Sequence, residues 1–332
     1  MSSFNSFTFV VLTYNHARFI LEHLESIKYL IENYGSDIDV DIIIADDASQ
    51  DGTVKICKLW FEKNSHLFRK VSVLSGSLNR GTCKNLTNAL AELNTYYCKI
   101  TAGDDVYSYE NLFLEINQLE GNHLLSGLPL NLVNQTLEST RFEIFNLYAT
   151  NIIYKNTHYL KRLKRINFFN SPSIVYAVPE LLRKDVTAFV AKYYVTEDYP
   201  LQIKMAELLD PLRFVQVDKI FVYYRRTESS TYIIKNNAFN QDKINIFNYL
   251  IKSEKVLLDE LLLQNRLFCF KLKNKYLKRI LNLNIYLYGF GVLTNIFTIL
   301  YKLKGIDIQS NRHQSHYDLI LLKANLFYST NI

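Results

Sequence analysis

The sequence contains few cysteines, and none has the paired spacing of a zinc or dithiol motif. Its 332 residues hold four, which are Cys57, Cys83, Cys98 and Cys269, and we interpret them as buried thiols of a protein in a reducing compartment. The first residues also lack the basic stretch and long apolar run of a signal peptide. We therefore expect a cytoplasmic protein.

The sequence also lacks a strong excess of charge of one sign. Lys and Arg number 38 and Asp and Glu 32, a formal net charge of +6, and the basic residues are scattered until the last third. This excludes nucleic acid as the expected partner, while a mild attraction to anionic lipid or phosphorylated substrates stays open. The apolar share of 48% indicates a globular chain. The length of 332 residues predicts two domains, or one domain of roughly 220 to 250 residues and an appendage.

The first 75 residues show a regular alternation of predicted strands and helices. Apolar, β-branched runs predict strands over 7–13, 40–45 and 71–74, and apolar residues at helical spacing predict helices over 19–31 and 54–61. Alternation of this kind is typical of a mostly parallel sheet flanked by helices. We therefore predict an α/β fold.

Polar clusters follow three of the apolar runs directly. Ligands of open α/β sheets bind beyond the carboxyl ends of the strands. One such cluster is ordinary turn chemistry, but three on the same edge predict a ligand site. The clusters are Thr13-Tyr14-Asn15, Asp46-Asp47 and Asp104-Asp105.

The adjacent carboxylates of Asp104 and Asp105 repel each other unless a cation lies between them. Gly103 permits a sharp turn before them. A hard divalent cation, shared with the phosphates of a ligand, would relieve the repulsion. The alternative is a turn in which both aspartates only cap the segment 109–114.

A glycine turn at Gly81 opens into another predicted helix and carries two cations. Arg80 and Lys84 are available to bind a diphosphate at the helix N-terminus. The alternative is that both side chains are simply solvated.

Four short segments together resemble the family 2 glycosyltransferases of the GT-A fold. They are 11–15, 44–53, 79–85 and 102–105, in the family's order and at its usual separations. The resemblance covers roughly residues 5 to 230. It implies a nucleotide-sugar-binding α/β domain over 1–235 with a mostly parallel central sheet flanked by helices, followed by a helical and α/β appendage over 236–332.

The resemblance assigns roles around the nucleotide. Thr13 and Tyr14, in a turn with Asn15, would lie against the uracil or its ribose. Asp46 and Asp47 are candidates to contact the base, and Asp47 is favoured.

The resemblance also implies a metal site. Asp105 would ligate Mg²⁺ or Mn²⁺ bridging the diphosphate, and Asp104 would bind the ribose or a sugar hydroxyl. Ala102 departs from the family, because many relatives have an acid there. Thr227 is a second departure, since relatives often carry a histidine at its position. Metal dependence is therefore less firmly implied than the fold.

Asp198 is the candidate catalytic base. Glu197 and Asp198 stand just before Pro200 at the start of a predicted helix, where capping alone would explain them. The resemblance implies that Asp198 accepts the proton of an acceptor hydroxyl and that the single displacement inverts the anomeric carbon. Arg225 and Arg226, in the family's closing strand and basic loop, would take over part of the charge neutralisation.

The middle of the chain is less patterned. We interpret 119–140 as a variable loop or helical excursion and 147–152 as a strand. The basic cluster 161–165 reads as a solvated helix face, or alternatively as a site for a phosphate-bearing or lipid-linked acceptor.

The last third begins with helical spacing over 239–278, after which 280–301 contains no charged residue. That run is long enough to span a membrane, but its asparagines and a Gly-x-Gly break favour a strand over 284–288, a turn and a helix over 292–303. Strands over 306–308 and 317–322 would complete a short, degenerate Rossmann-like unit at about 284–325. It would be a packing module, a membrane or partner surface, or a cofactor site.

The expected function is an inverting transfer from a nucleotide-sugar, UDP-linked, to a glycan or lipid-linked glycan of bacterial lipopolysaccharide or capsule. We place it in the cytoplasm, with peripheral association at the inner face of the membrane. One alternative is a sugar-phosphate nucleotidyltransferase, although the glycine-rich basic loop of that class is missing after the first strand. The other is a scaffold that binds a nucleotide-sugar without catalysis.

Overall fold

A computed structural model describes residues 6–138, 141–166, 168–226, 237–306 and 308–332. Within these residues one sheet of nine strands runs in the order β3-β2-β1-β4-β8-β6-β9-β5, with β7 paired to β6. The strands are β1 Ser6–Thr13, β2 Asp39–Asp46, β3 Lys70–Ser75, β4 Tyr97–Ala102, β5 Val106–Tyr107, β6 Leu124–Val133, β7 Thr136–Glu138, β8 Ile174–Ala177 and β9 Phe214–Arg225.

The amino-terminal half of the sheet is parallel, as predicted. β1 pairs in parallel with β2 and β4, and β2 pairs with β3. The connecting helices are α1 Ile20–Tyr34, α2 Thr53–Asn64 and α3 Thr82–Ala91. Every residue of β1 is buried, which explains its nearly continuous apolar sequence.

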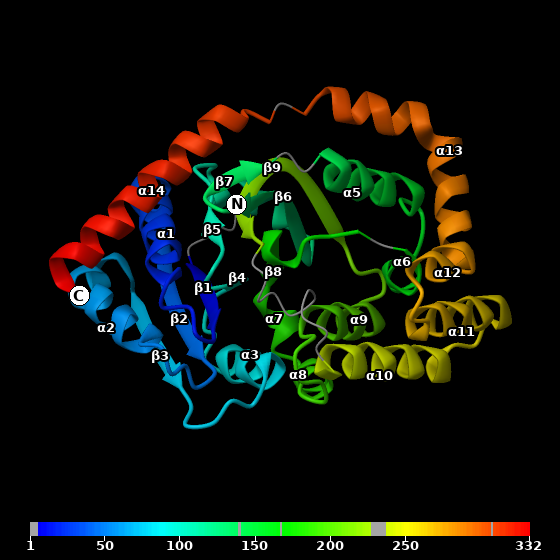
Figure 1. Ribbon diagram of the computed structural model, residues 1–332, viewed down its shortest axis with the longest axis horizontal. Helices are drawn as coiled ribbons and strands as arrows, with labels where there is room; N and C mark the ends of the chain where they lie inside the picture. The colour runs from blue at the N-terminus through cyan, green and yellow to red at the C-terminus, as the bar shows by residue number, and fades with distance from the viewer. Residues whose placement is uncertain (1–5, 139–140, 167, 227–236, 307) are drawn as a thin grey trace.

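Helices cover both faces of the sheet (Figure 1). Phe7, Phe9 and Val11 of β1 pack against α1 and α2, while Val10 and Leu12 point to the opposite face, which α3 covers. The other helices are α4 Leu112–Ile116, α5 Arg141–Ile153, α6 Tyr159–Lys164, α7 Val178–Leu181, α8 Lys184–Val190, α9 Asp198–Leu208, α10 Asn237–Ser253, α11 Leu257–Lys271, α12 Lys275–Ile280, α13 Leu283–Lys304 and α14 Ser310–Asn331.

The middle of the chain contradicts two predictions. The described part of the segment 119–140 is not a loop, because β6 lies centrally between β8 and β9 and pairs with both. The segment 147–152 is not a strand, because it lies in α5, where Ile144, Leu147 and Tyr148 form one buried face. The strand β6 was not predicted because it contains Gly127 and Pro129, which are unfavourable in strands. A run of apolar residues in α5 resembled a strand.

The predicted Rossmann-like unit is also wrong. The segment 284–288 belongs to α13, which continues through Gly289 and Gly291, and the segment 317–322 belongs to α14. Gly291 serves close packing instead of a turn, since a β-carbon there would lie 3.0 Å from Ile153 of α5. The predicted domain boundary near residue 235, like Thr227, lies outside the described residues.

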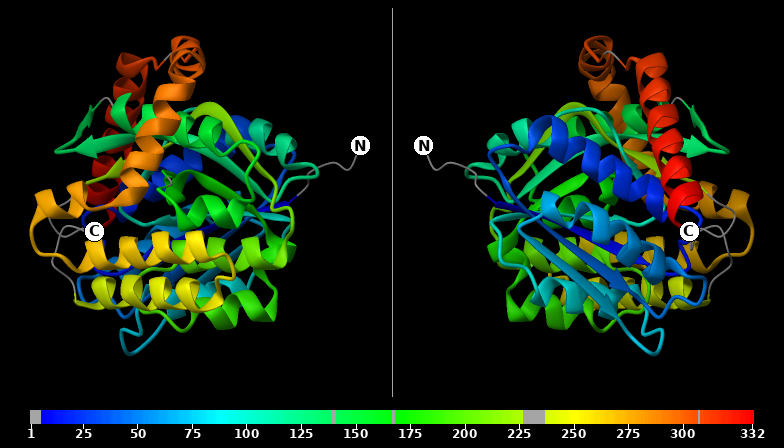
Figure 2. Two further views of the ribbon diagram at one scale, coloured as in Figure 1. Left: turned by 90° about the vertical axis from the view of Figure 1, so that its right-hand side faces the viewer. Right: turned by 90° about the vertical axis from the view of Figure 1, so that its left-hand side faces the viewer.

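The two last helices lie on different sides of the molecule. In Figure 1, α13 runs along one edge beside α5, and α14 returns across the molecule to α1. Figure 2 shows the two helices from opposite sides. The last two helices therefore pack against the sheet domain at two separate places.

Candidate functional site

The three predicted turns meet at one edge of the sheet. Thr13 is paired with Asp46 and Leu12 with Ala102 in the parallel register. Asp47 N donates to Thr13 O (2.9 Å), and Gly103 N donates to Leu12 O (2.9 Å). The turn after β4 thus abuts the turn after β1, which is where sequence reasoning expected a ligand.

Thr13, Asn15 and Asp46 hold the first two turns together. Thr13 Oγ1 donates to Asp46 Oδ1 (2.9 Å), and Ser49 N donates to Asp46 Oδ2 (2.9 Å). Asn15 has a positive φ of 56° and accepts from Gln50 N at 2.8 Å. These side chains are committed to neighbouring groups, and they shape the edge of the site.

Tyr14 differs from its neighbours in the same turn. Its side chain is 47% exposed, beside a buried Thr13. An aromatic ring presented by a turn that is held in place by hydrogen bonds can pack against a planar ligand.

Asp47 positions the glycine turn before α3. Its carboxylate accepts from Arg80 N (2.7 Å) and Gly81 N (2.8 Å). Gly81 has a φ of +86°, and a β-carbon there would lie 2.4 Å from Tyr194 O. The exposed side chains of Arg80 and Lys84 are therefore held at the start of α3.

Asp105 is buried with one oxygen unsatisfied. Its Oδ1 accepts from Arg225 N at 3.0 Å, whereas its Oδ2 has no hydrogen-bond partner among the described residues. Burial, followed by the charge of Asp104, raises the pKa of the Asp105 carboxyl well above its usual value. A buried carboxylate oxygen without a donor is suited to a cation.

The two arginines at the end of β9 are paired within the protein. Arg225 donates to Glu22 (2.5 Å) and to Asp104 O (2.6 Å). Arg226 contacts Glu143 and donates to Asn131 Oδ1 at 2.9 Å. Arg225 thus supports the Asp104–Asp105 turn from behind.

The part of the chain that the structure describes does not gather three His, Cys, Asp or Glu side chains around one point. A cation at Asp105 would therefore need ligands from bound phosphate or water in addition to the protein. The residues present fit a metal shared with a diphosphate and do not form a closed protein cage.

Asp198 begins α9 at the wall of a cavity of about 440 Å³. Its Oδ2 accepts from Ser171 Oγ (2.7 Å) and its Oδ1 from Tyr199 N (2.6 Å). The other lining residues include three cations and several apolar groups: Leu163, Phe169, Tyr199, Lys243, Phe247, Arg266, Cys269, Phe270, Lys278 and Asn282.

Helix α10 contributes residues that sequence reasoning missed. Asp242 accepts from the backbone N–H groups of Tyr194 (3.0 Å), Val195 (2.8 Å) and Thr196 (3.0 Å). This carboxylate fixes the segment that leads to Asp198. Nothing local marks Asp242 in the sequence, because the segment that it holds lies more than 40 residues earlier.

Two ionisable neighbours of Asp198 have shifted pKa values. Burial, followed by the charge of Asp198, raises the pKa of Glu197. Burial lowers the pKa of Lys243, whose ammonium lies 4.5 Å from the centre of the Tyr199 ring. Ionisable residues with shifted pKa values of this kind are common at functional sites.

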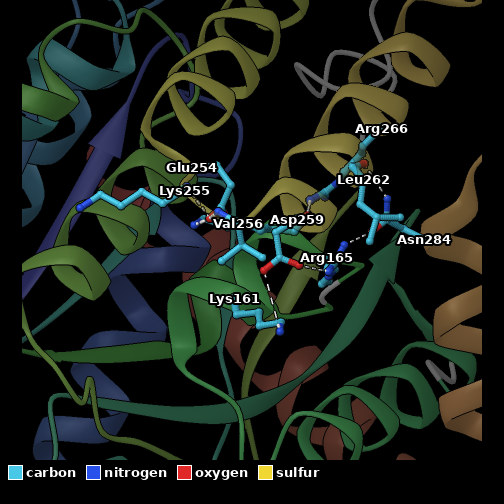
Figure 3. Close-up of polar contacts among 10 residues, drawn as sticks. Lys161, Arg165, Glu254, Lys255, Val256, Asp259, Leu262, Arg266 and Asn284 are labelled. Carbon is cyan, nitrogen blue, oxygen red and sulfur yellow. Dashed lines mark hydrogen bonds and ion pairs between the residues drawn. The ribbon is translucent and has the colours of Figure 1, made fainter.

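The basic cluster 161–165 is not a solvated helix face. Arg162 is buried and lies 5.0 Å from the centre of the Phe214 ring. Arg165 forms a buried ion pair with Asp259 of α11, as Figure 3 shows. The cluster attaches α6 to the carboxy-terminal helices, a role that the local sequence could not reveal.

A model of the glycosyl transferase family 2 matches residues 8–174 of this chain. Abequosyltransferase RfbV of Salmonella typhimurium is 30% identical over 105 residues, which are 32% of this chain and 30% of that protein. The chain therefore aligns with under a third of this relative's length.

Solved structures share the fold over nearly the whole chain. S. aureus TarS 1–349 has a TM-score of 0.55 and 18% identity, covering 96% of this chain and 91% of that one. The mannosyltransferase PcManGT from Pyrobaculum calidifontis, in complex with GDP-Man and Mn²⁺, has a TM-score of 0.54 and 15% identity, covering 98% and 87%. TarS has also been solved in complex with UDP-GlcNAc, at a TM-score of 0.53 and 17% identity, covering 80% and 72%.

A curled, mostly parallel sheet with helices on both faces and a polar carboxyl edge is the GT-A fold of glycosyltransferases. The chain belongs to family 2 of the glycosyltransferases.

Proposed function

We propose that this enzyme transfers a sugar from a UDP-sugar to a hydroxyl of a glycan acceptor and inverts the anomeric carbon. The observation that carries the proposal is the placement of Asp198. Its carboxylate is oriented by Ser171 and faces a cavity that apolar and cationic side chains line. A carboxylate so held can accept the proton of an acceptor hydroxyl.

The donor would bind at the sheet edge. We assign the uracil or its ribose to the turn of Thr13, Tyr14 and Asn15, with the exposed ring of Tyr14 packing against the base. Asp46 and Asp47 would support this pocket through the hydrogen bonds that they already make, and Asp47 would be the nearer to the base.

The diphosphate would lie near the start of α3 and the Asp104–Asp105 turn. We assign it to Arg80 and Lys84, because Arg225 and Arg226 are engaged in internal ion pairs. Asp104 would bind the ribose or a sugar hydroxyl.

Asp105 would hold Mg²⁺ or Mn²⁺. The support is its unsatisfied buried oxygen, which a cation would complete. When bound, the metal would neutralise charge on the departing nucleoside diphosphate. Ala102 leaves the site without one acid that many family members have, so a bound donor's phosphates would supply more of the metal's ligands.

The biological setting that we propose is the synthesis of bacterial lipopolysaccharide or capsule. The support is the partial similarity to a transferase of abequose, in addition to the family. The acceptor would be a glycan or lipid-linked glycan, reached in the cytoplasm at the inner face of the membrane.

A donor panel tests the function. The purified chain with Mn²⁺ should gain thermal stability in the presence of UDP-sugars and release UDP slowly by hydrolysis. A response to GDP-mannose alone would overturn the UDP assignment. No response to any nucleotide-sugar would overturn the proposed function.

A further inference from the structure

The outward face of α13 is apolar, and its inward face packs on the protein and makes hydrogen bonds to it. On the inward face, Tyr288 OH donates to Asn146 Oδ1 (2.8 Å), and Lys302 pairs with Asp218 (2.8 Å). The outward side chains are large, apolar and 52% to 86% exposed; we call the following six the apolar face: Tyr286, Phe290, Leu293, Phe297, Leu300 and Tyr301. A continuous patch of this kind marks an interaction surface.

Positive charge is concentrated in the segment of the chain that contains the apolar face. Residues 252–304 contain ten Lys and Arg but only three Asp and Glu, whereas the whole chain has a net charge of +6, so the remainder is close to neutral. Lys275 and Arg279 of α12 and Lys304 at the end of α13 are exposed at the two ends of the apolar face. Apolar and aromatic side chains bordered by cations complement the surface of a bilayer that contains anionic lipid.

Helix α13 is long and apolar enough to cross a membrane, with 22 residues. One of its faces is committed to the protein, however. A β-carbon on Gly291 would lie 3.0 Å from Ile153 of α5, and Asn284 is buried and donates to Leu262 O at 3.0 Å. Because these contacts hold the helix along its length, only the outward face can meet lipid, which is the geometry of a helix lying in the interface.

We propose that α12 and α13 form a membrane-binding surface. The apolar face would enter the boundary between headgroups and acyl chains, and Lys275, Arg279 and Lys304 would lie against anionic headgroups. Lys278 of α12 and Asn282, which caps α13, also line the Asp198 cavity. The membrane would therefore lie beside the acceptor cavity, a consequence that rests on the proposed function and favours a lipid-linked acceptor.

Vesicle sedimentation tests this surface without using activity as the readout. The full chain is mixed with phosphatidylcholine vesicles with and without about 30% phosphatidylglycerol, at low and high salt. One variant combines Phe290→Gln with Phe297→Gln, and a second combines Lys275→Gln with Arg279→Gln. The matched control combines Tyr96→Gln with Leu114→Gln, which are 69% and 61% exposed outside the patch.

The original chain should sediment with anionic vesicles, and high salt should weaken that binding. Each patch variant should lower the partition coefficient by about tenfold or more, and the control should bind like the original. Absence of vesicle binding, or equal loss in the control, would overturn the proposal. So would a dimer in solution that the Phe290 and Phe297 substitutions dissociate, because the face would then join two copies. A chain that binds vesicles but no nucleotide-sugar would overturn the proposed function and leave this surface standing.

Discussion

At the scale of single residues, hydrogen bonds separate the acids that build the site from those available to a ligand. Asp46 and Asp47 accept from several donors of adjacent turns. Asp105 keeps one buried oxygen without a partner in the described part of the chain, and Asp198 faces a cavity. In the sequence, Asp46, Asp47 and Asp105 are all acids that follow apolar runs, and Asp198 is an acid at a predicted helix start. Only the contacts distinguish their roles.

The role of Asp198 predicts a selective loss of transfer. Asp198→Asn keeps the shape of the side chain and the contact with Ser171 but removes the proton acceptor. We expect UDP-sugar affinity to stay within about twofold, while transfer falls by roughly 10² to 10⁴. Calorimetry measures the first quantity and UDP release with acceptor the second.

Asp185→Asn is the matched control, because Asp185 also lies in the first turn of a helix but is exposed on α8. It should leave both quantities unchanged. Transfer retained in Asp198→Asn would remove this residue from the role of base.

At the scale of elements, α10 acts on the site through the segment that precedes α9. Asp242 satisfies three successive backbone N–H groups that would otherwise lack partners. Helix α10, although it follows the family model's matched range, therefore positions the segment that leads to Asp198, the proposed base.

Replacing Asp242 should therefore affect transfer more than donor binding. Asp242→Asn retains one acceptor oxygen and weakens the hold on 194–196, so we expect about tenfold slower transfer, equivalent to about 1.4 kcal/mol, with an unchanged donor affinity. Asp242→Ala leaves the N–H groups unpaired and should lower the free energy of unfolding by on the order of 3 kcal/mol.

Gln241→Ala is the control on the same helix, since Gln241 is exposed and its amide donates to its helical neighbour Asn245. Thermal unfolding and single-turnover transfer provide the two readouts. Equal effects of Asp242→Asn and Gln241→Ala on transfer would refute a positioning role for Asp242.

The elements that the sequence predicted correctly have strong local signals. The strand that ends at Thr13 and the helix that follows it are marked by apolar periodicity within one window. The predictions failed where contacts with residues distant in the sequence determine the structure. Gly289 and Gly291 lie within α13 because α5 packs against this helix, and Arg165 is buried because Asp259 lies opposite it.

At the scale of the whole molecule, α14 ties the carboxy-terminal end of the chain to the sheet edge. Tyr317 OH donates to Glu22 Oε2 at 2.9 Å, and Glu22 pairs with Arg225 behind the Asp105 turn. His313 and His316 of the same helix are buried, and burial lowers the pKa of each to about 4.

This burial predicts a loss of stability in mild acid. Between the unfolded pKa of about 6.5 and the folded value of about 4, each histidine binds a proton in the unfolded chain but not in the folded one. The contribution of these two histidines to the free energy of unfolding should therefore fall as pH falls through this window, by up to about 1.4 kcal/mol per pH unit for each histidine.

Urea unfolding at several pH values between about 7.5 and about 4.5 measures this slope. His313→Gln combined with His316→Gln should flatten it, whereas His66→Gln, an exposed control, should not. The same slope in the double variant and in the original chain would contradict the assignment.

The most direct test of the central claim is calorimetry of UDP binding with Mn²⁺ and with EDTA, in the original chain and in Asp105→Asn. The unsatisfied oxygen of Asp105 predicts that Mn²⁺ strengthens UDP binding by about tenfold or more in the original chain. Asp105→Asn should lose that response without a lower melting temperature, because it removes a buried carboxylate. An equal metal response in Asp105→Asn, or no UDP binding by the original chain under either condition, would contradict the account.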